Sequence, residues 1–400
     1  MNNEKRLVPK LRFPEFTHAW EQRTLEKCFS ERTERSEFGE LISVTLNAGV
    51  VKASSLDRKD NSSKDKKNYK KVEKNDIAYN SMRMWQGASG VSMYSGILSP
   101  AYTVLIPLPN TSSIFFSYYF KLEKMLKIFQ VNSQGLTSDT WNLKYPILKN
   151  IFVNVPNYQE QQKIGTFFTA LDRYITIHQR KLENIQKLKK SLLQKMFPKN
   201  DQEFPEIRFP EFTYAWEQRK LGEAFVQTSE YINPKKHNAE LWSLTVENGL
   251  TPKTERYQRD FLVKKEDSFK LVHTNEFVYN PMNMTLGAVG YNDMPYSVAI
   301  SGYYVTMKTS HITDDLYMKV WLKTSQAISL YKENATGSLI EKQRVQFNTF
   351  SKIQFHLPNP QEQQKIGTFF TALDRYITIH QRKLENMQKL KKSLLQQMFV

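Results

Sequence analysis

The sequence predicts an α+β protein built by tandem duplication, in which two diverged, mostly β blocks alternate with two long helices. The first observation is an internal repeat, because residues 159–197 return as 361–399 with 37 of 39 positions identical. The second is a hydrophobic period of three and four residues inside the repeat. The third is a series of short β-prone runs outside it. The chain is therefore expected to consist of two similar halves.

Each half opens with a proline-bounded, aromatic segment. Residues 9–29 recur at 205–225 with 14 of 21 positions identical, and both copies contain the phrases RFPEF and AWEQR. This composition favours an extended arm that enters a folded block, with Trp20 and Leu25 as core anchors. Direct contact of Trp20 with a ligand is the alternative to core packing.

The blocks that follow, at residues 30–158 and 226–360, have diverged in sequence. Faint correspondence survives in phrases such as NDIAYNSMRM at 75–84 and NEFVYNPMNM at 275–284. Short β-prone runs between turn signals predict a mostly β or α+β fold for each block. These runs are Tyr102–Ile106, Ile151–Val155, Tyr303–Met307 and Ile353–Leu357, and one helix is expected at Ser117–Phe129 with an echo at Asp315–Tyr331.

The two repeated segments are each predicted to form one long amphipathic helix. Apolar residues recur at steps of three and four, and no proline interrupts them, which favours a surface that pairs with another helix. A core helix of a globular domain is the alternative, although such helices are usually far shorter. The predicted pairing seam comprises Phe168, Leu171, Ile175, Leu182, Ile185, Leu192 and Met196 in the first copy, and Phe370, Leu373, Ile377, Leu384, Met387, Leu394 and Met398 in the second.

The order of the segments predicts how the helices pair. The first helix runs from the first block to the second, and pairing along its length takes the second helix back toward the first block. We therefore expect an antiparallel, pseudo-twofold pair with the C-terminus near residue 1. Polar residues interrupt both seams, at His178 and Lys189 and at their equivalents His380 and Lys391. They either fix the register of the pair or form a solvated rim.

Composition narrows the class of protein. The net charge of +17 and the pI near 9.5 point to a polyanionic partner, with nucleic acid as the first candidate and a generally basic protein as the alternative. A single cysteine, Cys28, excludes an internal disulfide and a Cys-rich metal site. The start of the chain lacks the apolar core of a signal peptide, and no apolar run approaches the ~20 residues of a membrane span. We expect a cytoplasmic protein.

Motifs for catalysis are missing from the sequence. It contains neither a phosphate-binding glycine loop nor a dinucleotide fingerprint, so nucleotide binding has no support. The segment closest to an amino-methyltransferase tetrapeptide is Asn280-Pro281-Met282-Asn283, which lacks the second proline and the stacking aromatic. We therefore expect no catalytic residue and no metal site in this chain.

Polar loops of the blocks supply the candidates for nucleic-acid binding. The lysine-rich loop at 52–74 is either solvated or a clamp for DNA phosphates. Arg, Asn and Gln have the donor and acceptor geometry that base reading needs, although a plain surface turn also explains each loop. The candidates are Arg58, Lys59, Lys64, Lys66, Lys67, Arg83, Trp85, Gln86, Gln134, Thr137 and Ser138 in the first block, and Lys253, Arg256, Arg259, Asn283, Thr285, Thr336 and Ser338 in the second.

The repeated helices are nearly identical, whereas the blocks have diverged. If both halves performed the same task, the blocks and the helices would have accumulated substitutions to similar extents. This contrast indicates that the helices meet the same partner twice, while the blocks meet different ones.

With these alternating segments, and with the phrases RFPEF and PN-x-QEQQKIG in both halves, the whole chain resembles the specificity (S) subunit of a type I restriction-modification system. The resemblance implies that each block is a target-recognition domain for one half of a bipartite DNA site. It also implies that the repeated helices separate the half-sites and bind two copies of the modification subunit. The implied domains are 1–158, recognition domain 1 with the arm; 159–197, spacer helix 1; 198–360, linker and recognition domain 2; and 361–400, spacer helix 2.

The same resemblance implies that the chemistry lies in partner subunits. S-adenosylmethionine is then expected on the modification subunit and ATP on the restriction subunit, with no cofactor in this chain. Two other classes stay open: a self-contained methyltransferase or nuclease, which would need a cofactor motif, and a coiled-coil adaptor without a nucleic-acid role, which would leave the charge of +17 unexplained.

Overall fold

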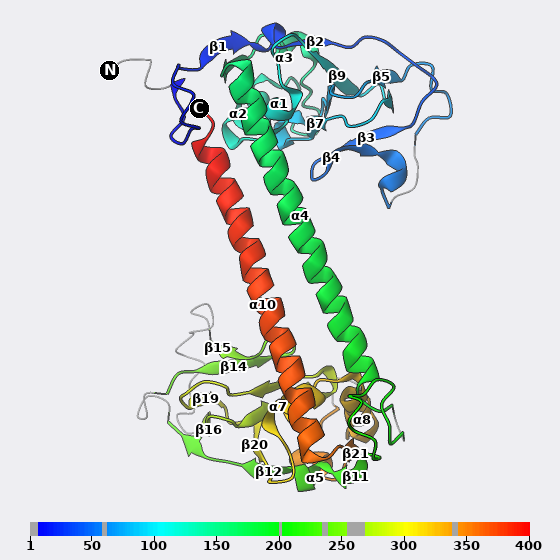
Figure 1. Cartoon of the computed structure of the whole chain (residues 1–400), viewed down its shortest axis with the longest axis vertical. Coiled ribbons are helices and arrows are strands. Elements are labelled where there is room, and N and C mark those ends of the chain that lie inside the picture. Colours follow the sequence, from blue (N-terminus) through cyan, green and yellow to red (C-terminus); the bar gives the residue numbers. More distant parts are fainter. Residues whose placement is uncertain (1–6, 58–61, 200–201, 234–238, 254–268, 338–342) are drawn as a thin grey trace. The chain divides into compact units, whose positions relative to one another are not determined.

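The computed structural model describes residues 7–57, 62–199, 202–233, 239–253, 269–337 and 343–400. Small antiparallel sheets and short helices alternate with two helices of 38 residues each, α4 and α10 (Figure 1). The α+β prediction is thus confirmed. The chain divides into two compact units, of which unit 1 contains Met1–Gln179 with Arg382–Val400 and unit 2 contains Arg180–Gln381. Each unit holds one block and a part of both long helices.

The block of unit 1 is organised around a four-stranded antiparallel sheet in the order β2, β9, β6, β7. Side chains alternate across it, so that Tyr79 faces the helices while the neighbouring Ala78 faces the smaller sheets. The strands are β2 (Phe29–Glu31), β9 (Tyr102–Pro107), β6 (Ile77–Asn80) and β7 (Ser89–Val91), with the pairs β3 (Ile42–Thr45) and β4 (Gly49–Lys52), β5 (Lys70–Val72) and β8 (Gly96–Leu98), and β1 (Glu21–Thr24) and β10 (Phe152–Val155).

Unit 2 repeats this topology with a four-stranded sheet in the order β12, β20, β17, β18. The alternation is also kept, because Tyr279 faces one core and Val278 the other. The strands are β12 (Phe225–Thr228), β20 (Val305–Thr309), β17 (Phe277–Tyr279) and β18 (Val289–Tyr291), with the pairs β14 (Trp242–Thr245) and β15 (Gly249–Pro252), and β11 (Glu217–Lys220) and β21 (Gln354–Leu357), and the trio β13 (Tyr231–Ile232), β16 (Phe269–Val272) and β19 (Val298–Ser301).

The single helix predicted in each block is wrong, because two helices stand in its place. In unit 2 the second helix begins after Thr324, a buried residue whose hydroxyl accepts a hydrogen bond from the backbone N–H of Ala327. The spacing of apolar residues continues through this break, so the sequence pattern predicted one helix instead of two. The short helices are α1 (Ser113–Tyr119), α2 (Glu123–Asn132) and α3 (Tyr145–Leu148) in unit 1, and α5 (Leu221–Ala224), α7 (Asp315–Trp321), α8 (Ser325–Asn334) and α9 (Phe347–Phe350) in unit 2.

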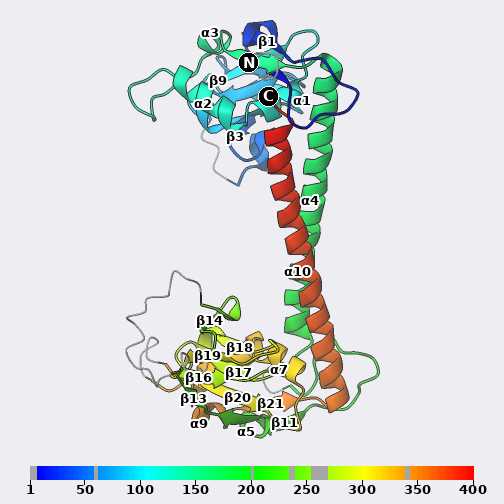
Figure 2. The same cartoon turned by 90° about the vertical axis from the view of Figure 1, so that its left-hand side faces the viewer.

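The helices α4 (Tyr158–Lys195) and α10 (Pro360–Gln397) pair antiparallel, as predicted. Within unit 1, Phe168, Asp172 and Tyr174 contact Phe399, Lys391 and Lys383, so the partner number falls as the α4 number rises. The equivalent contacts of unit 2 join Phe197 to Phe370, Lys189 to Asp374 and Lys181 to Tyr376. Figures 1 and 2 show the two helices side by side.

The predicted seam residues are buried or half-buried throughout. Those near the helix ends pack into the cores of the blocks rather than only against the other helix. The polar position Lys189 forms an ion pair with Asp374 of the opposite helix, and Lys391 does the same with Asp172. The buried seam residues are Phe168, Leu182, Met196, Phe370, Ile377, Met387 and Met398; the half-buried ones are Leu171, Ile175, Ile185, Leu192, Leu373, Leu384 and Leu394.

The last residues of each long helix enter the core of a block. Phe399 stacks on Phe115 at 5.2 Å between ring centroids and meets Trp20 edge-on at 6.2 Å. The backbone N–H of Leu11 donates to the carbonyl of Gln397 at 3.0 Å. The C-terminus therefore packs beside the N-terminal arm, as expected. Phe197 occupies the corresponding place in unit 2, beside Trp216.

The beginning of each long helix is fixed to the arm by a buried ion pair. Arg12 donates two hydrogen bonds of 2.7 Å to the two carboxylate oxygens of Glu160, whose side chain is fully buried. Arg208 and Glu362 form the same pair at the same distances in unit 2. Asn157 accepts a hydrogen bond from the backbone N–H of Glu160 and so caps α4.

The neighbouring glutamine connects the same helix to the block. Gln161 accepts a hydrogen bond from the backbone N–H of Ser112, next to α1, and donates to the carbonyl of Pro156. Gln363 accepts from Asp314 in the same way. One turn later, a Cβ at Gly367 would lie 2.5 Å from the backbone nitrogen of Tyr317, so only glycine allows α7 to pack this closely. The phrase PN-x-QEQQKIG is thus the socket that joins arm, block and helix.

This socket yields a stability prediction. Replacing Glu160 by glutamine leaves the Arg12 guanidinium buried without a counter-charge, and should lower the free energy of unfolding by about 3 kcal/mol. The matched control is Lys163→Gln, because Lys163 pairs with Glu15 at an exposed site on the same helix, where water screens the interaction. Urea denaturation followed by circular dichroism compares the two variants. Equal effects would contradict the proposed importance of the buried pair.

Candidate nucleic-acid interface

In each block, two polar loops that are distant in sequence meet at the end of a central strand. In unit 1 these are residues 81–87 and 133–143, where the backbone N–H of Leu143 donates to the carbonyl of Ser81 at 2.8 Å. In unit 2 they are 281–287 and a second loop described at 335–337 and 343–345, where the backbone N–H of Val345 donates to the carbonyl of Pro281 at 3.0 Å. We call each pair of loops a platform.

The backbones of the two platforms share the same supports. The side-chain oxygen of Asn80 accepts a hydrogen bond from the N–H of Met82 at 3.0 Å, and Asn280 does the same for Met282. Each first loop then makes a single 3-10 turn, at Met84–Gln86 and Met284–Leu286. It closes on a left-handed glycine, with φ of 90° at Gly87 and 87° at Gly287. In each second loop a backbone bridge joins the two sides, Gln134 to Asn142 and Thr336 to Arg344.

The side chains on these shared backbones differ almost throughout. Arg83, Trp85 and Gln86 of unit 1 correspond to Asn283, Thr285 and Leu286 of unit 2, and all six are exposed or half-buried. On the second loop, Gln134, Thr137 and Ser138 are exposed, as is Thr336. The structure therefore brings together the candidates Arg83, Trp85, Gln86, Gln134, Thr137 and Ser138 in one platform, and Asn283, Thr285 and Thr336 in the other.

The lysine-rich loop forms a different part of unit 1. It borders a cleft of about 860 Å³, and the described residues that line this cleft include Glu40 and Asp65 but no Lys or Arg. Lys66 donates to Ser62 and to the carbonyl of Ser63, both at 2.7 Å, and so supports its own loop. Lys64 and Lys67 are exposed, and Lys253 of unit 2 is half-buried. The candidates Arg58, Lys59, Arg256, Arg259 and Ser338 lie outside the described residues.

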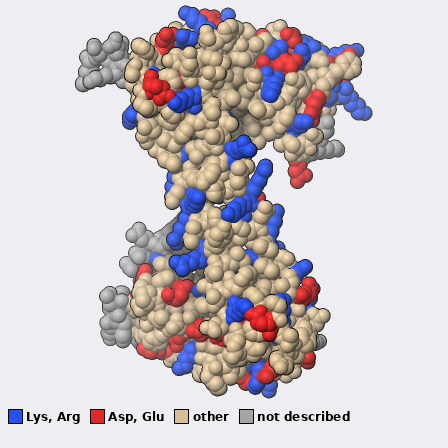
Figure 3. Space-filling view, in the orientation of Figure 1, with Lys and Arg blue, Asp and Glu red and all other residues tan. Residues whose placement is uncertain are grey.

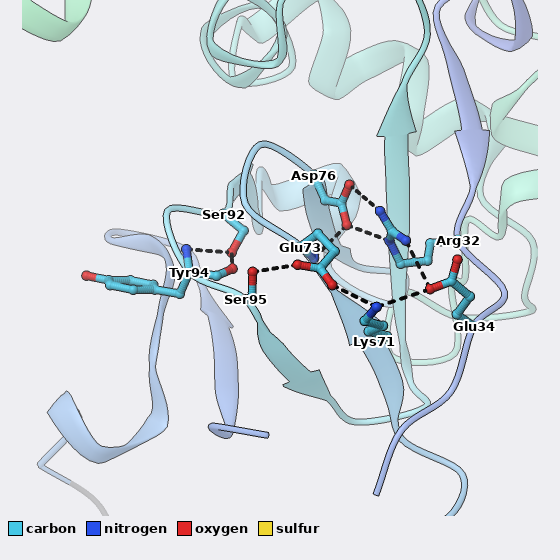
Figure 4. A network of polar contacts seen from close by, with 8 residues as sticks. All are labelled: Arg32, Glu34, Lys71, Glu73, Asp76, Ser92, Tyr94 and Ser95. Carbon is cyan, nitrogen blue, oxygen red and sulfur yellow. Dashed lines mark hydrogen bonds and ion pairs between the residues drawn. The ribbon is translucent and has the colours of Figure 1, made fainter. Parts of the chain in front are cut away.

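Several other cations near this loop are already paired with carboxylates. Lys71 contacts Glu73 at 2.8 Å, and this hydrogen bond raises the pKa of Lys71 above its usual value. Arg32 makes two hydrogen bonds to the buried Asp76, at 2.7 and 3.1 Å (Figure 4). Lys52 pairs with Glu40. These internal pairs leave less of the loop's charge for phosphates than the sequence count suggested.

Two lysines that the sequence analysis missed occupy equivalent positions beside the platforms. Lys121 follows α1, and its Nζ would lie 3.9 Å from a Cβ added at Gly49, the first residue of β4. Lys323 follows α7 and approaches Gly249 in the same way, at 3.1 Å. The two lysines are 202 residues apart, the spacing of the repeat, and this was the signal that could have found them.

These lysines lie among other positive charges. Burial lowers the pKa of Lys121, and the nearby Lys391 of α10 lowers it further. In unit 2, burial together with Lys319 and Lys189 lowers the pKa of Lys323. Carboxylates already pair with these neighbours, Asp172 with Lys391, Asp374 with Lys189 and Asp293 with Lys319. Lys121 and Lys323 are exposed to solvent, so they are the lysines of each cluster that a phosphate can approach. Each unit thus combines variable side chains on a platform with a shared cationic cluster.

The long helices carry much of the positive charge. α4 contains eight Lys or Arg against three Asp or Glu, and α10 contains seven against three. On the face shown in Figure 3, Lys and Arg side chains gather along these helices. The basic character of the chain is therefore not confined to the candidate loops.

Comparison with known proteins decides the family. The profile of the type I restriction modification DNA specificity domain matches residues 25–187 and again residues 215–389. The chain belongs to this family. Each match covers one block and most of the long helix that follows it, so the family's domain occurs twice here.

Individual relatives are distant. The specificity subunit of the type I restriction enzyme MjaVIII from Methanocaldococcus jannaschii is 24% identical over 165 residues, which are 40% of this chain and 38% of that protein. The chain thus matches well under half the length of this relative. The crystal structure of the S subunit of a type I restriction-modification system from M. genitalium superposes with a TM-score of 0.58 at 15% identity, covering 98% of this chain and 99% of that one. The HsdS subunit of Thermoanaerobacter tengcongensis gives 0.49 at 12% identity, over 97% and 98%.

Across the described residues, no group of three or more His, Cys, Asp or Glu side chains is arranged to hold a metal ion. In the same part of the chain, no helix is long and apolar enough to cross a membrane.

The shared cationic cluster predicts a salt effect. Replacing Lys121 and Lys323 together by glutamine should reduce the slope of log affinity for DNA against log salt concentration by about 1.8, because each phosphate contact contributes ~0.9. Sequence preference should stay unchanged. Lys71→Gln is the control, since Glu73 already neutralises this lysine. A double variant with the parental slope would show that these lysines do not contact phosphates.

Proposed function

We propose that this chain is the DNA-recognition subunit of a type I restriction-modification complex, with one platform reading each half of a bipartite site. The observation that supports this is the repetition of one platform backbone with different side chains. A structural loop would be free to lose its supports, and a loop with one fixed ligand would keep its side chains. Shared supports with unlike side chains suit two readers of two different sequences.

The chemistry of the platforms fits base recognition. Arg83 can donate two hydrogen bonds to guanine, and Gln86 or Gln134 can pair with adenine in the major groove. Unit 2 offers Asn283, which favours adenine, and Arg344 on its second loop. Because the two sets differ, the recognised half-sites should differ as well, and the complete site should be asymmetric.

We further propose that two copies of the modification subunit dock on the long helices. Each helix carries the same exposed apolar residues. Tyr174, Ile177 and Leu188 lie near one face of α4 and are 45%, 54% and 54% exposed. Their equivalents on α10, Tyr376, Ile379 and Leu390, are 41%, 54% and 53% exposed. Large apolar side chains left in water at repeated positions are typical of an interaction surface. Identical surfaces bind identical partners.

In the proposed complex, DNA recognition and catalysis belong to different subunits. Methyl transfer and its S-adenosylmethionine belong to the modification subunit, and ATP belongs to the restriction subunit. This chain selects the sequence and performs no reaction of its own. The lack of any recognisable cofactor motif in the sequence supports this division.

An exchange of blocks tests the proposed function. Residues 30–155 are replaced by the corresponding block of a relative, and the chain is expressed with its modification subunit. One half of the methylated sequence should change while the other half is retained, because each platform is built from a single block. Single-molecule sequencing of methylated adenines gives the result. If both halves change together, or if neither changes, the blocks are not independent readers.

A further inference from the structure

The platform of unit 1 contains a pair of tryptophans, one from each loop. The rings of Trp85 and Trp141 meet edge to face, with 5.2 Å between centroids and 75° between planes. The indole N–H of Trp85 donates to the carbonyl of Met82 at 3.2 Å, which fixes the orientation of that ring. Both rings are half-buried. The pair therefore presents a rigid apolar surface in the middle of a polar platform.

The second unit shows that the fold does not require this pair. Thr285 and Gln343 stand at the corresponding positions, on a backbone with the same supports. The remaining tryptophans are different, since each is 7% exposed or less and belongs to a hydrophobic core; they are Trp20, Trp216, Trp242 and Trp321. The half-buried pair is thus absent where the same scaffold serves another sequence, which points to a role in recognition.

The position and shape of the pair narrow its target. Arg83 precedes Trp85 by two residues and the exposed Lys144 follows Trp141 by three, and Asp139 is the only carboxylate on the described loops 81–87 and 133–144. A side chain that wedges between base pairs must protrude, and the residue that protrudes here is Leu136, which is fully exposed. Half-buried rings lie level with the surface instead. Such a surface suits apolar contact with a group on a base edge, and the C5-methyl of thymine is that group in the major groove.

We propose that Trp85 and Trp141 form a methyl-reading surface that selects a thymine in the half-site of the first block. This inference rests on the proposed function and adds the base and the chemical group. On the described residues of the second platform, Thr285 and Gln343 stand where the two rings stand in the first, so no aromatic pair is formed at these positions. The two half-sites should therefore differ in their response to the loss of thymine methyl groups.

Replacement of thymine by deoxyuridine tests this directly, because it removes the methyl group and leaves base pairing intact. Synthetic duplexes carry the mapped site with one thymine replaced at a time, and the chain is assembled with its modification subunit. At one position of the first half-site, the native complex should lose about fourfold in affinity, the value of one buried methyl group. The Trp85→Thr, Trp141→Gln variant should bind the thymine duplex about fourfold more weakly and show no further loss with deoxyuridine.

The variant carries the residues that unit 2 holds on the same scaffold, and the second half-site is its internal control. Tryptophan fluorescence gives a second measurement, because the native and variant complexes contain the same modification subunit and differ only at Trp85 and Trp141, while the other four tryptophans of this chain are buried. The specific duplex should reduce acrylamide quenching in the native complex and not in the variant.

Equal sensitivity to deoxyuridine in both proteins, or a first half-site without thymine, would overturn the inference. A complex that shows no sequence-specific binding at all would instead refute the proposed function.

Discussion

The buried ion pair between the arm and the start of each long helix is the contact on which the rest of the architecture depends. Arg12 and Glu160, like Arg208 and Glu362, are held in a nearly water-free place, where a lone charge would be strongly unfavourable. Both partners must therefore be present together. Because the adjacent glutamine binds the block, arm, block and helix are fixed at a single point in each unit.

This constraint explains the unequal divergence of the chain. The first turns of each long helix and its last residues, Phe197 or Phe399, are built into the core of a block. Each block must offer the same receiving surface, so the helices and their sockets are held to one sequence. The platforms lie on other loops and are free of this demand. Their supports are kept while their side chains have changed, and this combination would let one subunit acquire new DNA sequences without rebuilding its fold.

Local sequence signals predicted the repeat, the two long helices, their antiparallel pairing and the α+β class. They also placed Trp20 and Leu25 in the core, where both are almost fully buried. The break before Thr324 was missed because a capping residue has no apolar signature. The meeting of loops 81–87 and 133–143 was also beyond a local reading, since a backbone hydrogen bond between Leu143 and Ser81 leaves no trace in the residue pattern. Lys121 was missed because the groups near it belong to β4 and α10, which are distant in sequence; its spacing of 202 residues from Lys323 was the one local clue.

The central claim is that sequence selection resides in the blocks and not in the long helices or the sockets. It is tested most directly by a chain that carries the second block twice, with residues 226–357 in place of 30–155. Asp314 of the second block, which binds Gln363 in the native chain, then takes the place of Ser112 and binds Gln161, and the residues that pack on Phe197 pack on Phe399. Mapping of methylated adenines in cells that express this chain with the modification subunit should find a site made of the second half-site twice. A well-folded complex that still methylates the original bipartite sequence would contradict the account.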